Sequence, residues 1–582
     1  MRADDRGSAF ARAAGLFNRI AVSVWFAYGS ILLIQSKLLW GIWAHRDLTA
    51  GDTSSYFVTA SRWMHSFDVT ASWSPLYTVS WGSLRWLIHD PYASTIVIRV
   101  LITLAASLLV LAVLRRLFSP GIAWALAVWW AIVPVNYDVM YEVHLSVLLP
   151  LLAAVLIALT WTGLRMRAAV FAVLLATAVL LRNEAAVPLA VWTVAWISYE
   201  VRVRRQGTGV PIRTLIYAAG IPIAAVALVM TSALARSNGD VLTQARGEQT
   251  VGLCQAYAFG YQQRHDDFTG SPWLGCRPLM KRKFGRELPT LTQAIEANPG
   301  AMAEQVSWNA GLIPYSLQLM LFDRISAGQN HDPDYLPVRA NSTLALVGSI
   351  AAAAFLVSGF VLLWRGRERW WRDWIRPRAW GWLALAALGT ALLPVLFLQR
   401  PRPEYLFGLS VFTFAVLGLC AMAWLERLPR LKQLRAGIPI AAVLLTVLLP
   451  SHFTSAYETP LLARHGRPLG AMVARVHPVA AELRGGDVHL LATYADDGCN
   501  YIGEWDPCTA VHWTNIVPPN STADARPALS AHHVDFIYAD KTDLSQPWLR
   551  AAVAQAESGG WRRIAPAQQG QGWILLARPK SP

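Results

Sequence analysis

The chain has 582 residues, of which 54% are hydrophobic and only 15% are charged, and its mean hydropathy is +0.35. Soluble domains carry about 25% charged residues, so this composition excludes a soluble globular protein as well as a disordered, collagen-like or coiled-coil chain. The formal net charge of +15 would indicate a nucleic-acid binder only if the basic residues formed a patch on a soluble domain.

Eleven apolar stretches are candidates for membrane crossings, each of which needs about 20 mostly apolar residues. They lie near residues 20–43, 93–114, 120–136, 143–162, 168–182, 185–200, 214–235, 342–363, 379–398, 404–425 and 436–454. The fifth and sixth stretches are short and could form one helix interrupted at Arg182-Asn183-Glu184. We predict two helices, because merging them would reverse the side on which every later loop lies.

Basic residues concentrate in the segments that this topology places inside when the N-terminus is cytoplasmic. These segments contain Arg2, Arg6, Arg12, Arg19, Arg115, Arg116, Arg165, Arg167, Arg202, Arg204, Arg205, Arg213, the run 365–378, Arg427, Arg430, Lys432 and Arg435. The short outward segments hold only Arg182, Arg400 and Arg402. This distribution follows the positive-inside rule, and the first apolar stretch is predicted to be an uncleaved anchor because it is too long for a signal peptide.

Two larger pieces are predicted to face outward, the loop 236–341 and the tail 456–582. The loop has ten basic and ten acidic residues, and the tail has eleven and twelve. The excess positive charge therefore belongs to the cytoplasmic loops, and we expect no nucleic-acid partner. A further outer segment, residues 45–92, is rich in tryptophan and tyrosine, which predicts short helices in the membrane interface.

The tail is predicted to be a small α/β domain, so that residues 1–455 form a transmembrane domain and residues 456–582 a soluble one. Its predicted elements are a helix near 468–484, strands at 488–494 and 534–538, a helix near 546–558 and a strand at 573–577. The tail contains no glycine-rich phosphate loop and no nucleophile elbow. We therefore expect it to bind or cover a substrate and to do no chemistry.

The five cysteines fit an oxidising outer compartment. Cys254 and Cys276 lie in the outward loop, Cys499 and Cys508 lie in the outward tail, and Cys420 lies in an apolar helix. This parity predicts two disulfides and one inert thiol, and it predicts a stapled surface loop at Cys499-x8-Cys508. A zinc site would need closer cysteine spacing.

Ionisable residues outside the basic loops gather at the predicted outer helix ends. They are Asp52, Asp68, Asp138, Glu142, His144, Arg182, Glu184, Arg400, Arg402 and Glu404. Because charges near a bilayer are costly, such a cluster indicates function. Structural alternatives stay open: Asp52 as a helix cap, Asp138 and Glu142 as caps or metal ligands, His144 as a core residue, and the outer arginines as lipid-contacting anchors.

The order of these features resembles the GT-C glycosyltransferase superfamily, in particular bacterial relatives of protein O-mannosyltransferases and aminoarabinose transferases. The resemblance rests on Asp52, Tyr56, Pro75-Leu76-Tyr77, Asp138, Glu142, Arg182-Asn183-Glu184 and the segment from Glu304 to Asn309. It covers roughly residues 15–430. The chain departs from the family pattern at Thr53, where a second acidic residue is common, and at Ser74, where many relatives have proline.

The resemblance implies a GT-C fold and transfer of a sugar from a polyprenyl-phosphate carrier to a glycan, lipid or protein acceptor on the periplasmic face of a bacterial inner membrane. It implies catalytic roles for Asp52, as general base, and for Asp138 and Glu142. It implies donor-phosphate binding by Arg182, Arg400 and Arg402. The remaining implied substrate-binding residues are Tyr56, Tyr77, His144, Glu184 and Glu404.

Three other functions stay open at this stage. A flippase or transporter of lipid-linked sugars would depend on polar groups along a path through the membrane. An O-antigen-ligase-like transferase would use a diphosphate carrier, and a non-catalytic assembly subunit would use the tail to recruit partners. No cofactor is required by any residue pattern, and a divalent metal is an alternative at the acidic outer turn.

Overall fold

The computed structural model describes most of the chain. The described residues are 16, 19–20, 22–45, 47–48, 51–67, 74–132, 142–236, 240–269, 272–322, 342–398, 401, 405–428, 437–448, 468–483, 487–493, 495–504, 506–517, 523–565 and 573–579. The chain divides into two compact units. The membrane unit comprises Met1–Trp40, Thr70–Pro75 and Val100–His452, and the tail unit comprises Gly41–Val69, Leu76–Arg99 and Phe453–Pro582.

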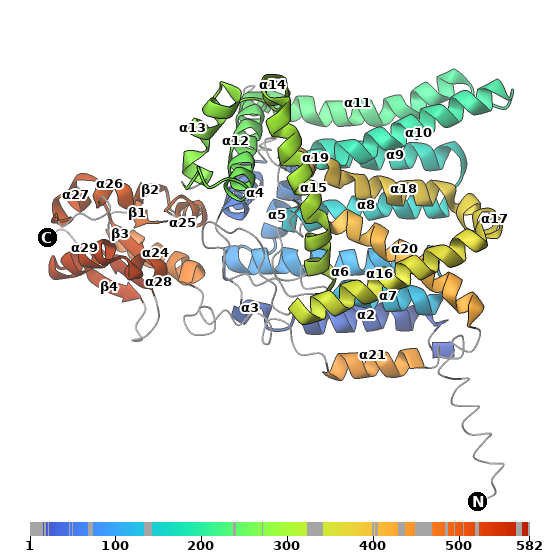
Figure 1. Ribbon diagram of the computed structural model, residues 1–582. Coiled ribbons are helices and arrows are strands. Elements are labelled where there is room, and N and C mark those ends of the chain that lie inside the picture. The colour runs from blue at the N-terminus through green and yellow to red at the C-terminus, as the bar shows by residue number, and fades with distance from the viewer. Residues whose placement is uncertain are drawn as a thin grey trace, which may run out of the picture. The chain divides into compact units, whose positions relative to one another are not determined.

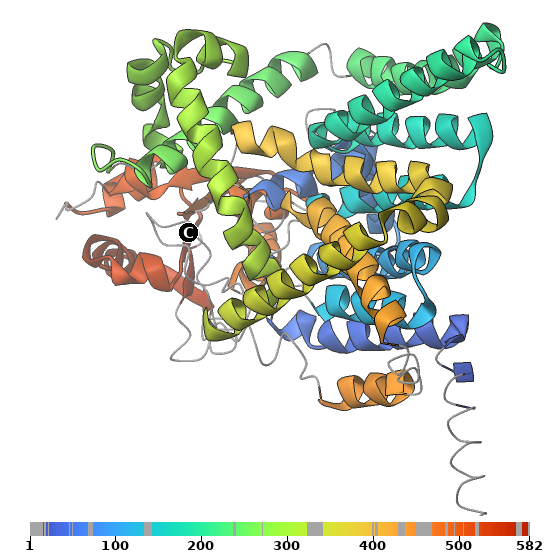
Figure 2. The same cartoon turned by 45° about the vertical axis from the view of Figure 1, so that its right-hand side comes forward.

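The chain is a helical multi-pass membrane protein with a small C-terminal α/β domain (Figure 1, and turned by 45° in Figure 2). Every predicted crossing coincides with helix. The helices are α2 (Val24–Leu38), α6 (Pro91–Leu117), α7 (Pro120–Ile132), α8 (Glu142–Thr160), α9 (Gly163–Leu180), α10 (Ala186–Arg205), α11 (Ile212–Arg236), α16 (Ser342–Arg365), α18 (Ala379–Gly389) with α19 (Leu393–Leu398), α20 (Phe407–Arg427) and α21 (Gly437–Leu448). Among the described residues, seven helical segments are long and apolar enough to cross a bilayer, so the count of eleven stays a prediction.

The fifth and sixth stretches form two helices, as predicted. A short 3-10 turn, Asn183–Ala185, separates α9 from α10, and the two helices pack against each other. At the far end of this hairpin, Arg167 and Glu200 form a buried ion pair with an N–O distance of 2.8 Å. The indole of Trp196 also donates to Glu200 at 3.1 Å. Pairing lets the protein bury both charges at lower cost than either charge alone.

The described residues of the loop 236–341 form helices joined by short turns. Its helices are α12 (Asp240–Gln262), α13 (Pro272–Phe284), α14 (Leu291–Ala297) and α15 (Pro299–Phe322). The predicted disulfide between Cys254 and Cys276 joins α12 to α13, and Asn309 of α15 donates to the carbonyl of Leu396 in α19 at 2.8 Å. The disulfide therefore joins two helices of the loop, and the Asn309 hydrogen bond attaches the loop to the helix bundle of the membrane unit.

The C-terminal domain contains a five-stranded mixed sheet in the order β2-β1-β3-β5-β4. The strands are β1 (Val488–Ala492), β2 (Cys508–His512), β3 (Phe536–Ala539), β4 (Arg562–Ala565) and β5 (Ile574–Ala577). The first strand is parallel to β2 and β3, and β5 is antiparallel to β3 and β4. The predicted helices near 468–484 and 546–558 are α24 (Pro468–Leu483) and α29 (Pro547–Ser558), so the α/β prediction is confirmed.

Shorter helices complete the tail unit. They are α3 (Ile42–His45), α4 (Asp52–Ser66), α5 (Pro75–Arg85), α25 (Ala495–Ile502), α26 (Trp513–Ile516), α27 (Arg526–Ala531) and α28 (Lys541–Ser545). The short helices expected in the segment 45–92 are therefore present. Although the sequence assigned that segment to the transmembrane domain, most of it belongs to the tail unit.

One prediction about the tail is wrong. The disulfide between Cys499 and Cys508 forms, but Cys499 lies in helix α25 and is only 9% exposed, so it is not part of a surface loop. A Cβ atom at Gly498 would lie 2.7 Å from Leu490 and 3.0 Å from Met472. The glycine therefore serves close packing of α25 on β1 and α24, and it does not mark a turn.

The acidic side chain of Asp543 predicts a pH dependence of the tail's stability. Burial, followed by the nearby Asp540 carboxylate, raises the pKa of Asp543 to about 6. Because the folded state then binds the proton more tightly than the unfolded state, stability is highest at low pH and is lost as the pH rises through this pKa. Between pH 4 and 6 we expect the free energy of local unfolding to fall by at most about 3 kcal/mol.

Amide hydrogen exchange of β3, corrected for intrinsic rates, measures this slope. The variant Asp543→Asn cannot ionise and should give a flat profile over the same range. An equally steep profile in the variant would contradict the assignment.

Candidate functional site

The carboxylate of Asp52 stands at the start of helix α4. Asp52 is exposed while the next two residues, Thr53 and Ser54, are buried. Gly51 occupies the N-cap position with φ 77° and ψ −141°, a conformation that side-chain-bearing residues rarely adopt. The chain thus enters the helix sharply, and the helix dipole favours a negative charge in this first turn.

Helix α4 is fixed to α5 by aromatic packing. The rings of Tyr56 and Tyr77 meet edge to face at 5.5 Å, and those of Phe57 and Trp81 meet at 5.7 Å. Tyr56 is 4% exposed and Tyr77 is 3% exposed. Both tyrosines hold α4 against α5, and their contact with a substrate stays a prediction.

The tail helix α25 contacts the turn that carries Asp52. The carboxylate of Asp497 accepts a hydrogen bond from the backbone N–H of Gly51 at 2.8 Å and one from the hydroxyl of Ser54 at 2.5 Å. Asn500 donates to the same hydroxyl oxygen at 3.0 Å. Burial raises the pKa of Asp497, and these two donated hydrogen bonds oppose the rise.

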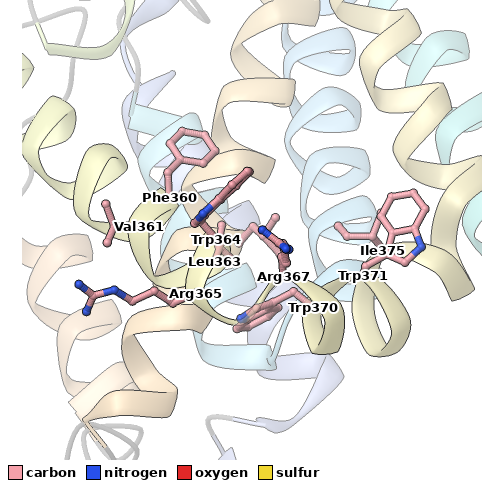
Figure 3. Close-up of a pocket in the computed structure, with 10 residues that line it drawn as sticks. Phe360, Val361, Leu363, Trp364, Arg365, Arg367, Trp370, Trp371 and Ile375 are labelled. Carbon is pink, nitrogen blue, oxygen red and sulfur yellow. The ribbon is translucent and has the colours of Figure 1, made fainter.

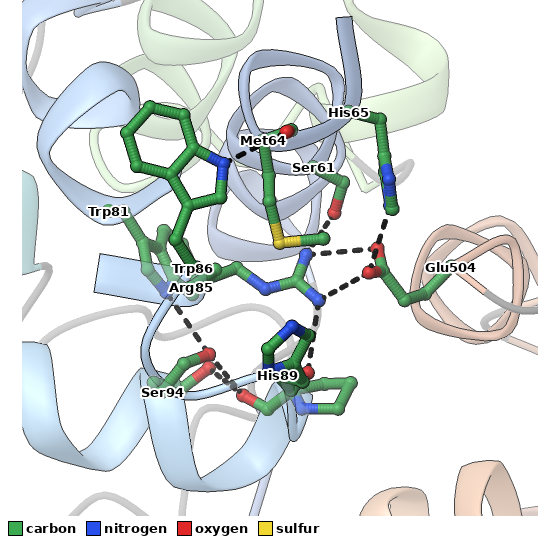
Figure 4. A network of polar contacts seen from close by, with 11 residues as sticks. Ser61, Met64, His65, Trp81, Arg85, Trp86, His89, Ser94 and Glu504 are labelled. Atoms are coloured by element: carbon green, nitrogen blue, oxygen red, sulfur yellow. Dashed lines mark hydrogen bonds and ion pairs between the residues drawn. The ribbon is translucent and has the colours of Figure 1, made fainter. Parts of the chain in front are cut away.

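A second contact joins Arg85 of α5 to Glu504, just after α25 (Figure 4). The Arg85 guanidinium is fully buried and reaches the two Glu504 oxygens at 2.7 and 3.0 Å. It also lies 4.2 Å from the centre of the Phe57 ring, and His65 of α4 contacts Glu504 at 3.2 Å. Loss of one partner of such a buried pair leaves an uncompensated charge.

In a third contact the acceptor belongs to the segment 45–92 and the donors belong to the tail. Asp47, just before α4, accepts hydrogen bonds from the backbone N–H groups of Leu469 at 2.7 Å and Gly470 at 2.8 Å. These groups belong to the first turn of α24, where a carboxylate satisfies otherwise unpaired donors. The segment 45–92 and the tail are therefore held together at three separate points.

Sequence reasoning missed the residues that make these contacts. They are Asp47, Arg85, Asp497, Asn500 and Glu504. The spacing of Asp497, Asn500, Tyr501 and Glu504 is i, i+3, i+4 and i+7, which is one face of a helix. That pattern was available in the sequence, but the adjacent glycine and the disulfide favoured a loop.

In the membrane unit the structure brings together three predicted site residues. His144, Arg182 and Glu184 line one narrow pocket of about 40 Å³ with Tyr405. Arg182 donates to both oxygens of Glu184 at 2.5 to 3.1 Å, and the rings of His144 and Tyr405 meet edge to face at 4.6 Å. Since sites for whole ligands are about 300 Å³ or larger, this pocket fits only a small part of one.

Several other predicted residues have no described position. Asp138, Arg400, Arg402 and Glu404 lie outside the described residues, as does Asp68. Glu142 is described, and it is buried in the first turn of α8 with 3% exposure. Its catalytic role and those of the residues outside the described part stay predictions.

The segment around Glu304 forms a polar cluster between α12 and α15. Glu304 receives hydrogen bonds from Arg264 at 2.7 Å and contacts His265 at 2.9 Å. Partial burial would raise the pKa of Glu304, but these two neighbours outweigh it and hold the pKa below its usual value. Within the described part of the chain, no group of three or more His, Cys, Asp or Glu residues is arranged to hold a metal ion.

A larger pocket of about 590 Å³ lies where α16 meets the short helix α17 (Arg367–Trp370), as Figure 3 shows. Its walls are mostly apolar and aromatic, with Trp364, Trp370 and Trp371 beside Arg365 and Arg367. Among the described residues, none of the side chains that line it is acidic. Tryptophan beside arginine is typical of a membrane interface.

Comparison with known proteins gives distant structural likenesses. No protein-family model matches the chain, and no curated protein matches it. The oligosaccharyltransferase of Archaeoglobus fulgidus, solved with a tethered acceptor peptide, is 13% identical with a TM-score of 0.46, over 96% of this chain and 74% of that one. The apo form of that enzyme gives 12% identity and a TM-score of 0.45, over 89% and 70%.

A second similar protein is ArnT from Cupriavidus metallidurans, solved with bound undecaprenyl phosphate. It is 12% identical with a TM-score of 0.38, over 95% of this chain and 98% of that one. All of these TM-scores lie below 0.5.

Helix α5 packs closely on α4 at Gly82, and a substitution there tests whether the helix pair depends on this close packing. A Cβ atom at Gly82 would lie 2.4 Å from the Ala60 carbonyl oxygen and 2.6 Å from the Trp63 ring. We expect Gly82→Ala to destabilise this helix pair by about 1–3 kcal/mol because backbone must move to admit the methyl group. Hydrogen exchange of α4 amides measures the change.

The matched control is Gly252→Ala in α12, where nothing lies within 4 Å of the added atom. That variant should be neutral, or more stable by about 0.5–1 kcal/mol, because alanine favours helix over glycine. Equal effects of the two substitutions would contradict the packing argument.

Proposed function

We propose that this protein is a GT-C-type membrane glycosyltransferase that moves a sugar from a polyprenyl-phosphate carrier to an acceptor, with Asp52 as general base. The observation that carries the proposal is the exposed Asp52 carboxylate on a turn in which Thr53 and Ser54 are buried and Gly51 and Ser54 are hydrogen-bonded. A general base must be accessible to the acceptor and must be held in one position.

The chemistry of the donor explains why one prominent carboxylate is sufficient. The acceptor hydroxyl gives its proton to Asp52 and forms a bond to the anomeric carbon, while the bond from that carbon to the phosphate oxygen breaks. The carrier phosphate leaves as an anion and needs no proton, unlike the leaving group of a glycosidase, which an acid must protonate. The site therefore requires one base and cations that hold the phosphate.

Arg182 is the described candidate for the phosphate, with Arg400 and Arg402 as candidates outside the described part. Guanidinium groups bind phosphate oxygens through paired N–H donors. The hydrogen bonds from Arg182 to Glu184 use its Nε and Nη2 atoms and fix the plane of the guanidinium group. In this proposal, Glu184 orients Arg182 at the pocket that His144 also lines.

The two disulfides support a location of the reactive side outside the cytoplasm. One lies in the loop 236–341 and the other in the tail, and disulfides persist mainly in oxidising compartments. Together with the basic inner loops, this supports a bacterial inner-membrane protein whose loop, tail and Asp52 face the periplasm.

Replacement of the proposed base is the direct test. Asp52→Asn keeps the shape of the side chain but removes its ability to take a proton. We expect the transfer rate to fall by about 100- to 10,000-fold while the protein still binds the lipid carrier. Purified protein in lipid nanodiscs with a radiolabelled lipid-linked sugar measures both.

Asp90→Asn is the matched control, because Asp90 is another exposed carboxylate of the tail unit and accepts the Ala93 N–H in the first turn of α6. Asparagine serves nearly as well in that position, so the control should keep its activity. Full activity of Asp52→Asn would rule out the base and would favour the transporter alternative.

The carrier's phosphate count separates the proposal from a ligase-type enzyme. We expect transfer from a sugar linked to polyprenyl monophosphate, and at most about 1% of that rate from the diphosphate-linked sugar, because the site is proposed to hold a single phosphate. Side-by-side assays with the two carriers at equal concentration provide the measurement. A preference for the diphosphate carrier would contradict the proposed donor.

A further inference from the structure

We infer that the tail helix α25 positions the catalytic base, and that Asp497, assisted by Asn500, is the positioning residue. This inference rests on the proposed role of Asp52. It assigns the tail a function beyond covering a substrate, because the tail would set the geometry of a group in a segment more than 400 residues earlier in the chain.

The residues on either side of Asp52 are held by Asp497. Gly51 precedes Asp52 and Ser54 follows in the same turn, and both donate to one oxygen of Asp497. The Gly51 carbonyl oxygen lies 2.8 Å from the Ser54 hydroxyl, so it competes with the Asp497 carboxylate for the single hydroxyl proton. A glycine at positive φ has little conformational restraint of its own, so the external carboxylate fixes the direction in which Asp52 leaves the turn.

The contact between the α25 region and α4 is long. The residues of α25 that face α4 continue beyond Asp497: Tyr501 packs on Phe57 with ring centres 4.8 Å apart, and Glu504 follows one turn later. The contacts run along the whole of α4, from its first turn to its last, and include one with α5. They are made by residues 497, 500, 501 and 504, and Figure 4 shows those of Glu504. Such a contact restrains both the tilt and the register of α4.

Helix α25 is itself fixed to the sheet of the C-terminal domain. The disulfide between Cys499 and Cys508 bonds α25 to the edge strand β2, and Gly498 lets the helix lie directly on Leu490 of β1. The sheet is thus a rigid base for the helix that carries Asp497. Residues whose supports are themselves fixed keep a reacting group within the small tolerance that catalysis requires.

These contacts predict a defect in turnover with little change in substrate binding. A displacement of about 1 Å at the base costs about 100-fold in rate. We expect Asp497→Ala to lower kcat by about 10- to 100-fold, with the KM for the lipid-linked donor within about twofold. Asp497→Asn retains an oxygen that can accept both hydrogen bonds and should recover most of the rate.

Asp496→Ala is the matched control. Asp496 is the adjacent carboxylate on α25, its side chain is 73% exposed, and its ion pair is with His512 of the tail sheet at 3.3 Å. It carries the same charge change as Asp497→Ala, and it should leave kcat unchanged.

Hydrogen exchange of a peptide spanning residues 48–56 reads the position of the turn without any activity. Asp497→Ala should accelerate exchange of the Gly51 amide by at least about 10-fold, because its acceptor is lost, whereas Asp496→Ala should not. If Asp497→Ala leaves exchange of the Gly51 amide unchanged, the positioning role is wrong. It is also wrong if Asp497→Ala leaves kcat unchanged while Asp52→Asn is inactive. Neither result contradicts the proposed role of Asp52.

A double-mutant cycle completes the test. If Asp497 acts through Asp52, adding Asp497→Ala to the Asp52→Asn variant should cause no further loss of its residual rate. A full additional 10- to 100-fold loss would overturn the inference. An active Asp52→Asn single variant would instead overturn the proposed function itself, so the two failures are distinguishable.

Discussion

The hydrocarbon core of a bilayer offers no water to backbone N–H and C=O groups, so each crossing must satisfy its own hydrogen bonds as a helix. This constraint organises the membrane unit as packed helices and excludes most charged side chains from their middles. Arg167, near the start of α9, and Glu200, near the end of α10, follow this rule, and they are buried as an ion pair with an N–O distance of 2.8 Å. Charged groups able to act on a substrate are consequently expected at helix ends and in the extramembrane pieces.

Within the tail unit, packing contacts hold the helix that carries Asp52 in place. A carboxylate on an isolated loop would be poorly restrained, whereas α4, which carries Asp52, is packed on α5 and contacted by α25 along its length. The contacts are reciprocal: Asp47 binds the first turn of α24, and Asp497 binds the turn before α4. Asp47 accepts two backbone N–H groups at the start of α24, and Asp497 accepts one at the N-cap of α4 together with the Ser54 hydroxyl; backbone donors at a helix start lack intrahelical partners.

Much of the fold could be predicted from local pattern. Apolar length located the helices, the basic loops separated α9 from α10, and short apolar runs located β1, β3 and β5. Cysteine parity gave both disulfides correctly. Helix α25 was missed because Gly498 has low helix propensity and resembles a turn residue, although tertiary packing on Leu490 favours it.

The candidate site shows the same division. The sequence by itself determined the residue types that can do chemistry at the helix ends, because burying charge in a membrane is costly and each such residue stands out. It could not determine that Asp497, Asn500 and Glu504 contact a segment more than 400 residues away. Hydrogen bonds and ion pairs between distant segments depend on how helices dock, which periodicity does not encode, so only the tertiary structure decided what holds Asp52 in place.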